Sequence, residues 1–172
     1  MSKVRVCIES ITPQVDCGRF PAKRTIGESV AVEADIFTDG HDAVAASLFY
    51  RHESTTEWHA VAMSPLGNDR WQAHFTVQTL GRYHFTVAGW VDHLESWRHG
   101  LAKKYEAGQD IELDLRHGAI LAHAVAERVR ENEARLLNDW ANAIADCVTT
   151  PNSTSPRMCK GATIRSGMSW IR

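Results

Sequence analysis

VAVEADIF, residues 30–37, places an apolar side chain at every second position, with the polar residues Glu33 and Asp35 between them. Successive side chains of an extended chain point to opposite sides, so this period of two gives the stretch an apolar face and a polar face. The apolar face consists of Val30, Val32, Ala34 and Ile36. A strand with one buried face is therefore predicted here.

The same period of two recurs in further parts of the sequence, which are residues 4–11, 44–52, 57–63, 70–78 and 82–91. Turn signals separate these segments, among them Asp39-Gly40, the run from Pro65 to Asp69, and Gly81. Six or so short strands divided by turns are typical of an antiparallel sandwich. We therefore predict an immunoglobulin-like antiparallel β-sandwich over residues 1–95.

The period changes to three and four residues from about Ser96. One helical stripe comprises Leu115, Ala119, Ala122, Val125 and Val129, and a second comprises Leu136, Leu137, Trp140, Ile144 and Ala145. This pattern predicts two or three α-helices over residues 96–147, with breaks at Gly100, Gly108 and Gly118. Ile111, Leu113 and Leu115 also alternate, so a short strand there is an open alternative.

Residues 148–172 form a third region, which is rich in Ser, Thr, Gly and Pro and contains no acidic residue. We predict an irregular tail there. The whole chain has a net charge of −2, and because residues 148–172 contain no acid, residues 1–147 are more acidic than this value indicates. An acidic body is not built to neutralise phosphates, which argues against a nucleic-acid partner.

No apolar run reaches the length of a membrane span or of a signal peptide, so the expected location is the cytoplasm and no membrane partner is expected. The four cysteines, Cys7, Cys17, Cys147 and Cys159, form no CxxC pair. Their spacing excludes a zinc ribbon. Cys7 lies in an apolar strand and is predicted to be a small core residue.

Histidines and acids offer weak signals for a site. His41 lies between Asp39 and Asp42, but a polar hairpin turn explains these residues better than a metal site. A second possibility is that three strand histidines share one sheet face, namely His59, His74 and His84. A solvated face is the favoured interpretation of that group.

Paired carboxylates for glycoside chemistry would have to face each other across a cleft. The acids of the sandwich region are Glu33, Asp35, Glu53, Glu57 and Asp69, and nothing in the sequence selects a pair from them. Motifs of nucleophilic hydrolases, P-loop proteins and dinucleotide-binding proteins are missing from the sequence. We therefore assign no catalytic, cofactor-binding or metal-binding residue, and we expect no cofactor.

Four tryptophans come from different segments, namely Trp58, Trp71, Trp90 and Trp97. An exposed pair of indole rings could hold sugars. Trp71 shares an alternating face with Ala73 and Phe75, so it is predicted to belong to the core. Trp90 falls on the opposite face of its strand, where burial under the helices is favoured over exposure.

Several long runs of the sequence resemble the opening of the bacterial α-1,4-glucan:maltose-1-phosphate maltosyltransferases, which belong to the α-amylase clan. The likeness covers residues 4 to about 147. Its most specific pieces are Asp16-Cys17-Gly18-Arg19, the block from Asp35 to Asp42, and the run from Pro65 to Trp71. After about Cys147 the sequence departs from the family pattern.

The resemblance implies an N-terminal β-sandwich with a helical insertion, which helps to form a homodimer and lies beside a catalytic (β/α)₈ barrel. The barrel, with its nucleophile aspartate and acid/base glutamate, would lie beyond this chain, so the chain is expected to end before it. The implied function is a non-catalytic assembly domain whose partners are a second copy and the missing barrel.

Two other functions stay open at this point. An independent module that binds carbohydrate, with α-glucan as its partner, would use exposed tryptophans. A metal-dependent enzyme that uses His41 would need a deep pocket with convergent polar groups.

Overall fold

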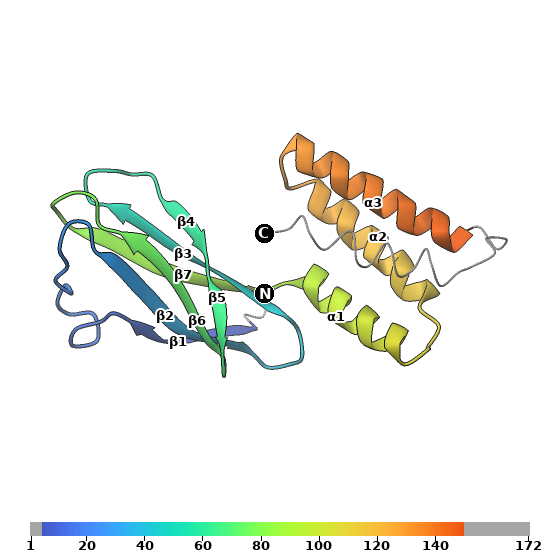
Figure 1. Cartoon of the computed structure of the whole chain (residues 1–172), viewed down its shortest axis with the longest axis horizontal. Coiled ribbons are helices and arrows are strands. Elements are labelled where there is room, and N and C mark those ends of the chain that lie inside the picture. Colours follow the sequence, from blue (N-terminus) through green and yellow to red (C-terminus); the bar gives the residue numbers. More distant parts are fainter. Residues whose placement is uncertain (1–4, 150–172) are drawn as a thin grey trace. The chain divides into compact units, whose positions relative to one another are not determined.

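The computed structural model describes residues 5–149, which fall into two compact units (Figure 1). The first unit ends at Asp92 and contains strands, and the second begins at His93 and contains helices. Helical structure therefore starts at His93, three residues before Ser96, the approximate position at which the sequence predicts the change of period. Each unit has a hydrophobic core of its own.

The first unit is an antiparallel sandwich of seven described strands. These are β1 (Val6–Thr12), β2 (Ser29–Thr38), β3 (Val44–His52), β4 (His59–Ala62), β5 (Ser64–Gly67), β6 (Arg70–Thr76) and β7 (Tyr83–Val91). One sheet has the order β1-β2-β6-β5 and the other β4-β3-β7. The first order is the A-B-E-D layer of immunoglobulin domains, so the predicted fold class is confirmed.

The core lies between the two sheets and is built by the alternation that the sequence shows. β2 pairs with β6 so that Val32 faces Ala73 and Ala34 faces Trp71. Val32, Ala34 and Ala73 are buried against residues of the second sheet such as Leu48. Trp71 is half-buried at the margin of this core, and its Nε1 donates a hydrogen bond to the Ile36 carbonyl at 3.1 Å.

Two details of the predicted sandwich are wrong. Part of the run from Pro65 to Asp69 is strand β5, and the turn is confined to its end, where Asn68 and Asp69 have φ values of 48° and 61°. Cys7 is exposed, because its neighbours Val6 and Ile8 pack against the core. The alternation that turns these two inward turns Cys7 outward.

The loop after β1 contains a left-handed turn. Asp16, Cys17 and Gly18 have φ values of 50°, 52° and 82°, and the Arg19 amide donates a hydrogen bond to the Asp16 carbonyl at 3.0 Å. Val15 and Phe20 close the turn through a β-bridge. Positive φ values are unfavourable for residues with a Cβ atom, so this turn holds strain at two consecutive positions.

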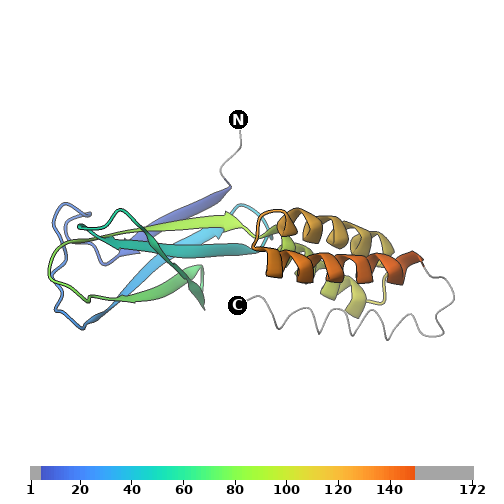
Figure 2. The ribbon, with the colours of Figure 1, turned by 90° about the horizontal axis from the view of Figure 1, so that it is seen from above.

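The second unit consists of α1 (His93–Glu106), α2 (Glu112–Ala126) and α3 (Glu131–Thr149). α2 and α3 lie side by side in both views (Figures 1 and 2). Ile111 precedes α2 and is buried, so the alternative of a short strand around it is wrong. α3 continues two residues beyond the predicted end at 147, and residues 150–172 of the predicted irregular tail lie outside the described residues.

Of the three predicted glycine breaks only Gly108 follows the end of a helix, with a φ of +68°. Gly100 and Gly118 lie inside α1 and α2. Gly118 is buried against the six-membered ring of Trp97, whose Nε1 donates a hydrogen bond to the Asp114 carbonyl at 2.6 Å. The hydrogen-bonded ring cannot move away easily, so only a residue without Cβ fits at 118.

We predict that Gly118→Ala destabilises the helical unit by about 1–3 kcal/mol, because the new methyl group overlaps the Trp97 ring and overpacks the core. Gly100→Ala is the matched control, since a Cβ there meets no atom within 4 Å. That variant should gain about 0.5–1 kcal/mol from better helix propensity. Urea unfolding followed by circular dichroism measures both changes, and equal stability gains would contradict the packing described.

Candidate functional site

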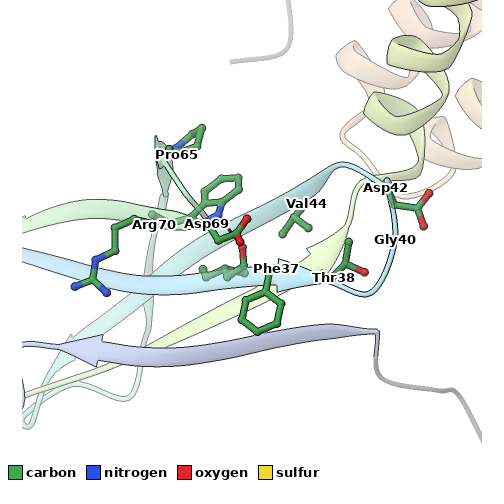
Figure 3. Close-up of a pocket in the computed structure, with 11 residues that line it drawn as sticks. Phe37, Thr38, Gly40, Asp42, Val44, Pro65, Asp69 and Arg70 are labelled. Carbon is green, nitrogen blue, oxygen red and sulfur yellow. Dashed lines mark hydrogen bonds between the residues drawn. The ribbon is translucent and has the colours of Figure 1, made fainter.

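A pocket of about 460 Å³ opens at one end of the sandwich (Figure 3). Its walls come from the end of β2, the start of β3 and the loop between them, and from the hairpin of β5 and β6. Asp42 and Pro65 lie at opposite ends, with Val44 between them (Figure 3). The volume is within the usual range for sites that bind small molecules. Whether this pocket can do chemistry depends on how its polar groups are used.

Most polar groups of the pocket serve the fold. The indole N–H of Trp71 is bound to the Ile36 carbonyl, and the Asp69 carbonyl accepts a hydrogen bond from the Ile36 amide at 2.8 Å. Asp42 pairs with Arg5 at 2.8 Å, and Arg5 also lies 3.4 Å from Asp39. These ion pairs tie the residue that precedes β1 to the loop that connects the two sheets.

Arg70 points from the rim of the pocket to the outer face of β2. Its guanidinium lies 3.0 Å from a carboxylate oxygen of Glu33 and 3.0 Å from one of Asp35. Gln72 donates a hydrogen bond to the other oxygen of Glu33 at 2.8 Å, and His74 contacts Gln72 at 3.0 Å. This group of residues, which we call the charged ladder, crosses the outer face of the sheet from β2 to β6.

The charged ladder is the place where ionisation is coupled to the fold. The pKa of Glu33 is lowered, first by the hydrogen bond from Gln72 and then by that from Arg70. Hydrogen bonds from Arg70 and Ser10 lower the pKa of Asp35. The pKa of Arg70 is raised in turn, chiefly by Asp35. Both carboxylates are thus held in the charged form, which suits an ion pair and not a proton donor.

The structure separates the histidines that the sequence suggests as a group. His59 and His84 belong to the sheet β4-β3-β7, but His59 pairs with Tyr50 and His84 with Arg51, so they lie on opposite faces. His74 belongs to the other sheet. Within the described residues no three His, Cys, Asp or Glu side chains are placed to hold a metal ion.

His41 is exposed in a loop that connects the two sheets, so the predicted hairpin is wrong. Each of the flanking acids, Asp39 and Asp42, forms an ion pair with Arg5. Glu53 accepts a hydrogen bond from the Arg82 amide at 2.9 Å and fixes a turn. Among the acids considered above, Glu33, Asp35 and Glu53 are therefore engaged in contacts that hold the fold.

Sequence reasoning missed the charged ladder, although Glu33 and Asp35 share the polar face of their strand. The missing information was the partner strand, since Arg70 meets them only because β6 lies next to β2.

The tryptophans named in the sequence differ in how exposed their side chains are. Trp58 and Trp90 have exposed fractions of 43% and 46%, whereas Trp97 packs edge to face against Trp140 at 5.8 Å.

These features define a β-sandwich module with a helical unit at its C-terminal side. Residues 4–165 match the family described as alpha-1,4-glucan:maltose-1-phosphate maltosyltransferase, domain N/S. The chain belongs to this family. The family match extends to residue 165, whereas the matches to individual relatives span 141 and 142 residues, which is close to the expected extent of the likeness from residue 4 to about 147.

Individual relatives agree with this assignment. The chain is 48% identical over 141 residues to the alpha-1,4-glucan:maltose-1-phosphate maltosyltransferase of Chlorobaculum tepidum. The matched segment covers 82% of this chain and 21% of the relative. It is 39% identical over 142 residues to that of Methylacidiphilum infernorum, with shares of 83% and 21%. The chain thus spans about a fifth of the length of these relatives.

Among the described helices, none is long and apolar enough to cross a membrane.

We predict that Arg70→Met lowers the melting temperature at pH 7, because Glu33 and Asp35 lose their shared cation. The lowered pKa values mean that the ion pairs contribute fully above the ordinary values of 4.5 and 3.8. Their contribution disappears as the pH falls through the folded-state pKa values. The gap between wild type and variant should therefore close towards pH 3.

Thermal melts from pH 7 to pH 3 measure this gap. Arg19→Met is the control, since the Arg19 side chain is 77% exposed and lies 3.9 Å from Asp16. Exposed pairs of this kind contribute little, so its melting temperature should follow that of the wild type. A gap for Arg70→Met that stays constant across the pH range would contradict the role of the charged ladder.

Proposed function

We propose that this chain is a cytoplasmic, non-catalytic assembly domain of an enzyme that extends α-1,4-glucan from maltose 1-phosphate. Membership of the domain N/S family supports the parent enzyme. The chain matches only 21% of each of the first two relatives. This small share favours an auxiliary role beside a larger catalytic part. The engaged acids of the sandwich support the absence of a catalytic role.

The observation that carries the assembly role is a second apolar stripe on the helices. Leu115, Ala119 and Ala122 already face the core of the helical unit. Leu113 and Ile120 lie seven residues apart on another face of α2, with exposed fractions of 79% and 66%. Residues at this spacing share a helix face. Leu136 on α3 is also 58% exposed.

Exposed branched aliphatic residues on neighbouring helices are typical of a surface that a partner covers. We assign this surface to a second copy of the chain, since a two-fold dimer is the commonest arrangement of identical chains. The catalytic part of the parent enzyme is the other proposed partner. Its position would be on surfaces that the dimer leaves free.

We predict that the chain forms a dimer and that the double variant Leu113→Glu, Ile120→Glu is monomeric, because two charges would be buried in the interface. Leu80→Glu is the control, as Leu80 is 85% exposed in the sandwich unit. That variant should remain a dimer. Sedimentation equilibrium distinguishes these masses, and a monomeric wild type at the highest soluble concentration would refute the proposed self-association.

We also predict that the chain alone transfers no maltosyl unit from maltose 1-phosphate to a glucan acceptor. The reason is that glycoside chemistry of this kind needs two carboxylates facing a shared sugar. Release of inorganic phosphate is the measurement, with the Chlorobaculum tepidum enzyme as positive control. Phosphate release that rises in proportion to the concentration of the pure chain would show that the domain is catalytic.

A further inference from the structure

The two outer faces of the sandwich differ in chemistry. The outer face of β1-β2-β6-β5 carries the charged ladder. On β3, Ala46 and Leu48 are buried in the core, so Ala45, Ser47, Phe49 and Arg51 form the outward row. β4 and β7 pair with β3 on its two sides, and their residues opposite this row point to the same side of the sheet. We call this row, together with its neighbours on β4 and β7, the aromatic face.

The aromatic face combines large rings with very small neighbours. Phe49 lies between Ala60 and Thr86, Ser47 lies between Ala62 and Ala88, and Ala45 lies beside Trp90. No Val, Ile or Leu occupies any of these outward positions, in contrast to the exposed stripe of α2. The face therefore lacks the branched side chains that interlock in a packed protein interface.

Trp58 and Trp90 mark the two ends of the aromatic face. The Arg51 guanidinium lies 5.1 Å from the centre of the Trp58 ring, and its Nη1 donates a hydrogen bond to the Thr55 carbonyl at 2.7 Å. Trp58 is thereby held in place on the outer side of β3 while 43% of it stays exposed. Trp90, at the level of Ala45, is 46% exposed.

The spacing of these rings suits an extended ligand. Arg51 and Ala45 are six residues apart on β3, which corresponds to about 20 Å at the usual rise of a strand. The outward side chains of Ser47 and Thr86 supply hydrogen-bonding groups between the two ends, and His84 supplies one at the level of Arg51. Indole rings offer flat apolar surfaces to the C–H faces of pyranose rings, and hydroxyl and imidazole groups can bind their hydroxyls.

We propose that the aromatic face binds an α-glucan chain, with Trp58 and Trp90 stacking on separate sugar rings. The proposal rests on the proposed function for its ligand class, since the parent enzyme would act on such a polymer. Because about 20 Å of strand separates Arg51 from Ala45, we expect a disaccharide to be too short to reach both rings. A longer chain contacts both rings in one molecule and gains affinity through the second contact.

The test measures binding of the full chain to maltose, maltoheptaose and soluble amylose by tryptophan fluorescence and by affinity electrophoresis. We expect affinity to rise at least ten-fold from maltose to amylose. Trp58→Ala and Trp90→Ala should each lower the affinity for amylose at least ten-fold, and Trp90→Tyr should restore part of it. Phe20→Ala is the matched control, because Phe20 is an aromatic residue with an exposed fraction of 53% in a loop of the same unit.

Thermal melts separate binding from folding, as both tryptophans are about half exposed and their variants should keep the melting temperature. A wild type that binds no glucan, or amylose affinity that survives both substitutions, overturns the proposal. Loss of the dimer in Trp90→Ala without glucan binding by the wild type would identify a protein contact instead. Sedimentation of the same samples tests the proposed dimer separately, so either idea can fail alone.

Discussion

The pairing of β2 with β6 is the constraint on which the sandwich depends. In this register Val32 meets Ala73 and faces the core, while Asp35 meets Arg70 on the outside. A shift by one residue would bring the carboxylates into the core and expose the valines. The apolar pairs supply the driving force for this arrangement, and the charged ladder makes the shifted register unfavourable.

The surfaces of the molecule follow from the same alternation. Each strand has one row committed to the core, so only the other row is free to meet a partner. On β1-β2-β6-β5 that row carries the charged ladder, whose charged groups are already paired with one another. On β4-β3-β7 it carries rings and small side chains, and on α2 it carries branched aliphatic residues. The three surfaces therefore differ in the side-chain chemistry that they offer.

The fold class could be predicted from the sequence because alternation is a local property of each strand. The same was true of the helices, whose period of three to four residues is local as well. β5 was missed because Pro65 and Gly67 resemble a turn when the pairing with β6 is unknown. The charged ladder and the aromatic face were missed for a related reason, since both depend on which strands are neighbours. Gly118 was misjudged because the contact with Trp97 joins two helices.

The left-handed turn at Asp16, Cys17 and Gly18 affects how variation in this part of the chain should be interpreted. Few residue types tolerate such backbone angles, so substitutions there would be selected against even where no ligand or partner touches the loop. This turn coincides with the tetrapeptide Asp16-Cys17-Gly18-Arg19, one of the pieces in which the sequence resembles the family. Its intolerance to mutation would therefore report on chain geometry, and a deep mutational scan could mistake this loop for an active site.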